Sequence, residues 1–204
     1  MLELIQKGGV LVVPIILCSV LAVAIFLERT IRFAILRRRG RSVDRDVATR
    51  VEADDPAGAM STAQHSRSPM GRVLVQGLDV MDGDRETLET VLIHAAEREV
   101  RDLSRYLQAL ATIGNIAPLL GLLGTVIGMI KAFMVIQEMG GKVNAAVLAG
   151  GIWEAMLTTA LGLTVALPTL VAHSYLAAQV DRYEARLQDG TVRFLKSLTV
   201  RKAV

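Results

Sequence analysis

Three long stretches without charge constrain this chain more than any other feature of its sequence. Residues 8–27 and 109–130 contain no charged side chain, and residues 143–180 contain only Glu154. A helix of about 20 apolar residues crosses the roughly 30 Å hydrocarbon core of a bilayer. The apolar share of 52% would also suit a soluble domain, so the distribution excludes a soluble enzyme, a secreted disulfide scaffold and a disordered protein. We predict an all-α membrane protein with three transmembrane helices.

Arginine is concentrated on one side of the first apolar stretch. Eight arginines lie between residues 29 and 50, Arg37, Arg38 and Arg39 among them, whereas Lys7 is the only basic side chain before the stretch. Positive charge beside a span stays in the cytoplasm. We therefore predict a periplasmic N-terminus, and three spans then give a cytoplasmic C-terminus. The net charge of +3 and the pI of 9.3 indicate orientation at a lipid bilayer, not binding to nucleic acid.

These rules divide the chain into membrane and aqueous segments. The predicted segments are a periplasmic N-terminus at 1–7, spans at 8–29, 107–132 and 146–174, a cytoplasmic helical region at 30–106, a periplasmic loop at 133–145 and a cytoplasmic helix at 175–204. Clusters of Pro and Gly at 53–58 and 66–71 predict breaks between short helices. From Asp84 an apolar face repeats without interruption, so we expect one long helix to run from the cytoplasm into the second span.

The third span has a similar extension in this interpretation. Seven residues at spacings of four or three form a heptad face: Leu176, Val180, Tyr183, Leu187, Thr191, Phe194 and Leu198. Such a face packs against other helices. Gly190 lies within the same stretch and favours a weaker helix there.

The second predicted span carries small residues at regular spacing. Gly114, Gly121 and Gly128 are seven residues apart, and Pro118 and Thr125 interleave with them at the same spacing. At about 100° per residue, all five fall within an arc of roughly 80°. Because apolar side chains gain little by leaving lipid, a face of small residues forms where another helix approaches closely. Two interpretations stay open, namely packing within one subunit and a face that lines a pathway or contacts a partner.

The third predicted span contains a single charge, Glu154. Helical spacing extends Glu154 into a stripe of small and polar residues: Thr158, Thr159, Gly162, Thr169 and His173. An ionisable residue within a span is by default a functional candidate that faces the bundle interior or water. Two alternatives stay open, because Glu154 could lie at the outer membrane surface or could be a structural hydrogen-bond partner of Thr125 or Asn115.

Motifs of catalysis and of metal binding are missing from the sequence. It contains no HExxH or GxSxG motif and no glycine-rich phosphate loop followed by lysine. The histidines, at positions 65, 94 and 173, are far apart. We therefore predict no enzymatic activity, no metal and no cofactor.

Two motifs resemble the ExbB/TolQ branch of the MotA/TolQ/ExbB proton-channel family. They are Ala117-Pro-Leu-Leu-Gly-Leu-Leu-Gly-Thr-Val-Ile-Gly128 in the second span and Glu154-Ala-Met-Leu-Thr-Thr-Ala-Leu-Gly-Leu-Thr-Val-Ala-Leu-Pro168 in the third. The order of three spans extends the resemblance to most of the chain, whereas the segment between residues 30 and 106 matches poorly.

The resemblance implies a homopentamer in the bacterial inner membrane that encloses two helices of an ExbD/TolR-type single-span partner. The channel residues of the family correspond to Glu154, Thr125 and Thr159, and Thr158 joins them through the polar stripe. Inward proton flow would turn the pentamer and the partner relative to each other and so energise a TonB- or TolA-type protein. A non-conducting membrane scaffold and the stator of a surface-motility machine stay open as alternatives. A small-solute transporter is less favoured, because no internal repeat is found.

Overall fold

Helices account for every regular element in the computed structural model, which describes residues 10–38, 42–138 and 145–203. In chain order the helices are α2 (Val12–Arg38), α3 (Val43–Glu52), α4 (Pro56–His65), α5 (Pro69–Asp79), α6 (Arg85–Ser104), α7 (Leu107–Glu138) and α8 (Ala145–Ala203). Stretches long and apolar enough to cross a membrane lie within Val12–Leu36, Arg85–Glu138 and Leu148–Arg201. The predicted all-α chain with three helices able to span a membrane is confirmed. The direction in which each helix crosses stays a prediction.

Some predicted segments fall outside the described residues. These are residues 1–7, Arg39, and residues 139–144 of the expected loop. Arg37 and Arg38 close helix α2. Helix α7 continues to Glu138, beyond the predicted end of the second span at residue 132.

Two compact units make up the described fold. The apolar unit comprises Met1–Glu28 and Tyr106–Tyr175, which include the start of α2, all of α7 and the first half of α8. The charged unit comprises Arg29–Arg105 and Leu176–Val204, which include the end of α2, helices α3 to α6 and the second half of α8.

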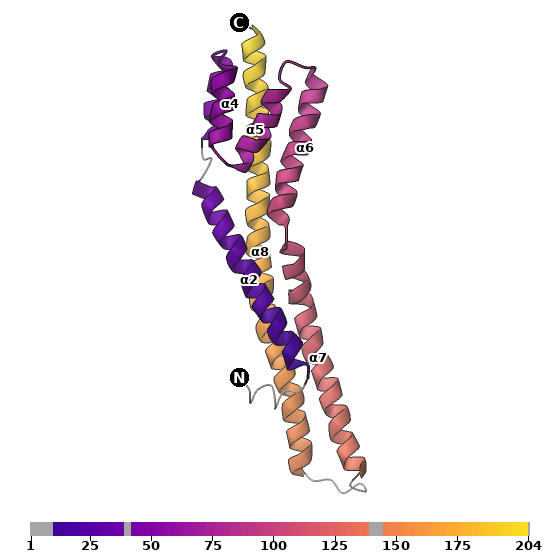
Figure 1. Ribbon diagram of the computed structural model, residues 1–204. Coiled ribbons are helices and arrows are strands. Elements are labelled where there is room, and N and C mark those ends of the chain that lie inside the picture. The colour runs from indigo at the N-terminus through magenta and orange to yellow at the C-terminus, as the bar shows by residue number, and fades with distance from the viewer. Residues whose placement is uncertain (1–9, 39–41, 139–144, 204) are drawn as a thin grey trace. The chain divides into compact units, whose positions relative to one another are not determined.

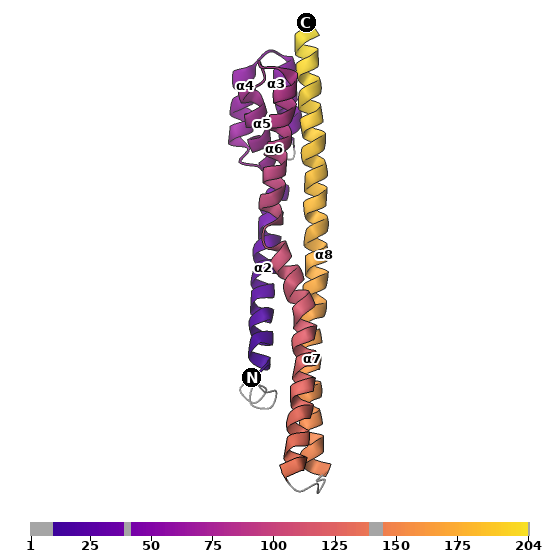
Figure 2. The same ribbon diagram turned by 90° about the vertical axis from the view of Figure 1, so that its right-hand side faces the viewer.

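Within the apolar unit, α7 and the first half of α8 lie side by side and antiparallel (Figures 1 and 2). Large apolar side chains point away from this contact, with Leu119 on α7 61% exposed and Leu167 on α8 64% exposed. Small residues such as Gly121 and Ala155 are buried instead. This inside-out distribution is typical of helices whose outer surface meets lipid.

Within the charged unit, helices α3 to α6 pack along one side of the second half of α8 (Figure 2). The predicted heptad face is buried at Leu176, Val180, Leu187, Phe194 and Leu198, which confirms its role in packing. Tyr183 and Thr191 on the same face are half-buried, and burial raises the pKa of the Tyr183 phenol.

Gly190 does not interrupt α8. The helix is continuous from Ala145 to Ala203. A Cβ atom at Gly190 would lie 2.6 Å from the sulfur of Met70 on α5. Glycine therefore serves a close approach between α5 and α8, and the surrounding core compensates for its low helix propensity.

The predicted breaks between short helices are confirmed at both Pro/Gly clusters. Pro56 and Pro69 occupy the first turns of α4 and α5, where a missing backbone N–H costs nothing. The side chains of Asp55 and Ser68 cap these helices by accepting backbone N–H groups of Gly58 and Gly71, at 2.8 Å and 3.1 Å.

The prediction of one uninterrupted helix from Asp84 into the second span is wrong. Helix α6 ends at Ser104, and α7 begins at Leu107. Between them Tyr106 has a φ of 68°, in the left-handed region that a bulky side chain rarely adopts. Leu103 and Leu107 are both buried on either side of the break. Neither glycine nor proline marks this break in the sequence.

Ion pairs connect the helices of the charged unit. Arg72 on α5 donates two hydrogen bonds to the buried carboxylate of Glu99 on α6, through Nε at 2.7 Å and through Nη2. The hydrogen bond to Glu99 raises the pKa of the Arg72 guanidinium. Arg29 is one of the arginines from which the membrane topology was predicted. Its side chain is buried and donates a hydrogen bond to the backbone carbonyl of Asp102.

Candidate functional site

The contact between α7 and α8 is formed by a glycine seam, which we define as Gly114, Gly121, Gly124 and Gly128 of α7. All four glycines are buried. A Cβ atom at Gly121 would lie 2.9 Å from both the carbonyl oxygen of Thr158 and the Cα atom of Thr159. No side chain fits there without separating the helices, because both neighbours are backbone atoms.

The α8 side of the seam is also made of small residues. A Cβ atom at Gly162 would lie 2.5 Å from the carbonyl oxygen of Ala117, and one at Gly128 would lie 3.0 Å from the Cβ atom of Ala155. At the far end, a Cβ atom at Gly151 would lie 2.6 Å from Ala132. The two backbones therefore approach closely over several turns, which lets polar groups of one helix reach the other.

Two threonine hydroxyls of α8 reach the backbone of α7 across this seam. Thr159 donates from Oγ1 to the carbonyl oxygen of Gly121 at 3.0 Å. The hydroxyl of Thr158 lies 3.4 Å from the same oxygen and 2.7 Å from the carbonyl of Ala155 on its own helix. Pro118, half-buried and one turn before Gly121, carries no N–H and so leaves the carbonyl of Gly114 without its helical donor. The backbone carbonyl groups of Gly114 and Gly121, which lack a helical donor or accept from threonine, thus lie within the apolar unit.

Glu154 lies beside the seam in a cavity of about 240 Å³. The cavity is lined by Val10, Leu11, Gly124, Ile127, Gly128, Lys131, Glu154 and Thr158. The carboxyl group is half-buried and, among the described residues, accepts no hydrogen bond and forms no ion pair.

The structure separates the predicted channel residues into two groups. Glu154 and the buried Thr158 share the cavity, and Thr159 lies next to them at the seam. Thr125 is half-buried and donates its hydroxyl to the carbonyl of Leu122 on its own helix at 2.6 Å. Asn115 is exposed. Glu154 therefore makes no hydrogen bond to Thr125 or Asn115, so the structural-partner interpretation gains no support from these described residues.

Five residues that line the cavity were not among the predicted site residues: Val10, Leu11, Gly124, Ile127 and Lys131. Gly124 and Lys131 share a face of α7 with Gly128, at spacings of four and three residues that were visible in the sequence. Lys131, which the predicted bounds place near the end of the second span, lies in helix α7 and lines the cavity. The contribution of Val10 and Leu11 from the start of the chain carried no sequence signal.

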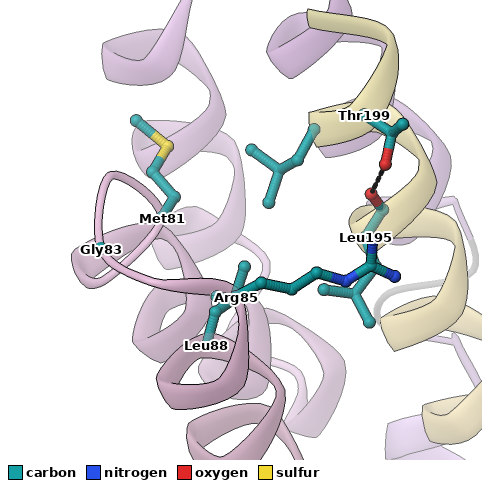
Figure 3. A pocket seen from close by; sticks show the side chains of 7 residues that line it. Met81, Gly83, Arg85, Leu88, Leu195 and Thr199 are labelled. Carbon is teal, nitrogen blue, oxygen red and sulfur yellow. Dashed lines mark hydrogen bonds between the residues drawn. The ribbon is translucent and has the colours of Figure 1, made fainter. Parts of the chain in front are cut away.

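A second cavity, of about 170 Å³, lies in the charged unit (Figure 3). Its lining is mainly apolar and includes Leu88, Leu195 and Leu198. The polar groups at its edge have partners, since Arg85 pairs with Glu89 and the hydroxyl of Thr199 donates to the carbonyl of Leu195. This cavity concentrates no reactive groups, so Glu154 marks the stronger candidate site.

Comparison with known proteins identifies the class of protein. Residues 65–189 match the MotA/TolQ/ExbB proton channel family. The chain is similar to the biopolymer transport protein ExbB of Salmonella typhimurium, with 34% identity over 197 residues that cover 90% of this chain and 78% of that protein. It is also similar to the biopolymer transport protein exbB1 of Vibrio cholerae, with 30% identity over 91% of this chain and 83% of that protein. The Tol-Pal system protein TolQ of Haemophilus influenzae is 37% identical over a shorter match of 44% of this chain and 39% of that protein.

Fold and relatives together define a multi-pass membrane protein of the transport and channel type. The chain belongs to the MotA/TolQ/ExbB proton channel family.

Proposed function

We propose that this chain is the proton-conducting subunit of an energising complex in the bacterial inner membrane, of the ExbB–ExbD or TolQ–TolR type. In this proposal the chain forms a homopentamer around an ExbD/TolR-like single-span partner. Inward proton flow through the complex drives a TonB- or TolA-like protein for transport across the outer membrane or for maintenance of the envelope. Family membership and the ExbB and TolQ relatives support this assignment.

One observation carries the proposal. Glu154 is the only charge between residues 143 and 180, and its carboxyl group lies in a cavity with no hydrogen-bond partner among the described residues. An unpaired carboxyl group within an apolar helix is costly, and it is tolerated where ions or protons move. Thr158 and Thr159 beside it supply hydroxyl groups that can extend a hydrogen-bonded path.

The predicted orientation gives this path a direction. With the arginines at 29–50 in the cytoplasm, the connection between α7 and α8 faces the periplasm. Along α8, Glu154 then lies closer to the periplasmic end than Thr158 does. Protons driven by the membrane potential would meet Glu154 first and the hydroxyl groups afterwards.

The test replaces Glu154 in cells and measures energised work together with assembly. Glu154→Gln and Glu154→Ala are expected to abolish uptake through an energised outer-membrane receptor, or envelope integrity in a Tol-type system. The complex should still assemble, as judged by cross-linking in the membrane. Glu138→Gln removes the same charge from the exposed end of α7 and serves as a matched control that retains function.

Full function of the Glu154→Ala variant would contradict the channel role. Full function of Glu154→Gln, combined with loss of assembly in Glu154→Ala, would identify a non-conducting scaffold in which Glu154 only packs.

A further inference from the structure

We propose that a groove between α2 and the first half of α8 binds one acyl chain of a phospholipid with an anionic headgroup, from the cytoplasmic leaflet. The groove is a cavity of about 440 Å³ within the apolar unit. It is lined by Ala22, Val23 and Phe26 of α2 and by residues between Pro168 and Tyr175 of α8. The inference goes beyond the proposed function, because it requires only that this unit lies in a bilayer.

The lining of the groove contains no polar group that needs a ligand inside it. Its polar side chains are Thr169 and Tyr175. The hydroxyl of Thr169 is satisfied on its own helix, where it donates to the carbonyl of Val165 at 2.7 Å. Tyr175 is half-exposed and is the last residue of the apolar unit. Because apolar cavities exclude water, the occupant of this groove in a bilayer is hydrocarbon.

The rim of the groove favours a lipid chain over a helix of a second copy. Helix α7 approaches α8 through the glycine seam, because helices in lipid associate where small residues let their backbones come close. The rim instead presents large side chains, with Val23 54% and Val171 71% exposed. These side chains hold another helix at a distance, whereas a flexible acyl chain can lie between them.

The charges that follow the groove along both helices favour an anionic headgroup. Beyond Phe26 the chain continues into residues 29–41, which contain six arginines and no acidic residue. On α8, Arg182 follows Tyr175 by two helical turns on the same face. Arg182 is exposed and forms no ion pair with any described residue, and the adjacent Asp181 lies about 100° around the helix axis from it.

The predicted topology places these basic segments in the cytoplasm. Anionic phospholipids give the cytoplasmic leaflet its negative surface potential, and arginines close to that surface attract them. A phospholipid whose chain occupies the groove would therefore have its phosphate at the end of the apolar unit from which the arginines follow.

The experiment uses the complex purified with its partner and reconstituted into vesicles of phosphatidylethanolamine and phosphatidylglycerol. In one sample a small share of the phosphatidylglycerol carries a diazirine on one acyl chain, and in the other sample the phosphatidylethanolamine carries the same chain. After irradiation, peptide mass spectrometry quantifies the label on the groove residues. The label on exposed side chains of α7, at Leu119 and Leu122, gives the level due to ordinary surface lipid.

Two pairs of variants test the groove and the charge separately. Ala172→Phe and Val23→Phe each fill the groove, whereas Leu167→Phe adds bulk at an exposed position of α8 outside the lining. Arg182→Gln removes the nearest basic side chain on the groove face of α8. Lys196→Gln removes the same charge about 21 Å farther along that helix and is its control.

We expect the phosphatidylglycerol probe to label the groove more strongly than it labels α7, and more strongly than the phosphatidylethanolamine probe labels the groove. Ala172→Phe and Val23→Phe should lower this label to the level of α7, and Leu167→Phe should leave it unchanged. Arg182→Gln should lower the ratio of phosphatidylglycerol to phosphatidylethanolamine label by up to about fivefold, and Lys196→Gln should preserve the ratio.

Three results would overturn the inference. Equal labelling by the two probes would exclude selection of an anionic headgroup. Groove label at the level of α7, or label that both filling variants leave unchanged in assembled complexes, would indicate ordinary surface lipid. A groove that neither probe labels would mean that protein, such as a second copy, covers it. Glu154-dependent proton flux, measured on the same vesicles, tests the proposed function separately, so the two failures are distinguishable.

Discussion

The apolar unit and the charged unit hold their helices together in opposite ways. Between α7 and α8 of the apolar unit, glycines bring backbone against backbone, and Gly121 has no room for a single methyl group. In the charged unit, large side chains fill the space between helices, and Phe194 and Leu187 of α8 are completely buried. One helix, α8, thus uses small residues in its first half and bulky residues in its second half.

The difference follows from what surrounds each unit. In water, burying large apolar side chains drives helices together, at roughly 25 cal/mol for each Å² of apolar surface. In lipid this drive is absent, so helices associate through close packing and hydrogen bonds between backbones. The size of the side chains at the contact between helices therefore indicates whether lipid or water surrounds each unit. Enlarging a contact residue should destabilise the apolar unit, whereas shortening one should destabilise the charged unit.

The largest effect is expected from shortening a bulky side chain in the charged unit. Phe194→Ala removes a fully buried aromatic ring from the core between α8 and its neighbours. It should lower the free energy of unfolding by about 3 to 5 kcal/mol. Denaturant unfolding of the protein in detergent micelles, followed by circular dichroism, measures the loss. Val192→Ala, at an exposed position of the same helix, is the control and should change little.

In the apolar unit, the damaging change is the addition of a methyl group. Gly121→Ala places a Cβ atom 2.9 Å from backbone atoms of Thr158 and Thr159, so the helices must separate and the hydrogen bond from Thr159 weakens. The expected cost is about 1 to 3 kcal/mol in the same unfolding measurement. At Gly150 a Cβ atom meets nothing within 4 Å, so Gly150→Ala should be neutral or slightly stabilising. Equal stability of the two variants would argue against the seam.

The smallest effect concerns pH and is expected only in the charged unit. Asp84 caps α6 by accepting the backbone N–H of Thr87 at 3.0 Å, and hydrogen bonds from the side chain and backbone of Thr87 hold the pKa of Asp84 below its ordinary value of 3.8. Folding therefore favours the carboxylate, and this stabilisation is complete above about pH 5 and is lost as the pH falls through the lowered pKa.

Asparagine caps a helix about as well as aspartate but does not titrate. On acidification from about pH 5 to about pH 3, the melting temperature of the wild type should therefore fall more than that of Asp84→Asn. Thermal unfolding at several pH values measures the difference. If the melting temperatures of the wild type and Asp84→Asn differ by the same amount at every pH in this range, the charge of Asp84 contributes nothing to stability.

Local sequence signals were sufficient for much of the fold. Charge-free stretches marked the apolar helices, Pro56 and Pro69 marked helix starts, and the heptad face of α8 marked the core of the charged unit. The break at Tyr106 left no such signal, because no glycine or proline stands there and tyrosine rarely adopts the left-handed conformation. A local pattern predicts what a segment can form by itself, but not where its surroundings will interrupt it.

For the candidate site, the sequence indicated the residues of each helix better than their partners. The isolation of Glu154 in a long uncharged stretch was visible, whereas its neighbours depend on the register between α7 and α8. That register places Lys131 at the Glu154 cavity and leaves Thr125 bonded to its own helix. Register is set by the fit of two backbones, which spacing along one chain does not encode.

Proton flux per complex in native membrane vesicles, compared between the wild type and Glu154→Gln, tests the central claim most directly. The substitution keeps the size of the side chain and removes its ability to carry a proton. We predict that the flux of an assembled Glu154→Gln complex falls to the level of vesicles from a strain that lacks the chain. An assembled Glu154→Gln complex with the proton flux of the wild type would contradict the account.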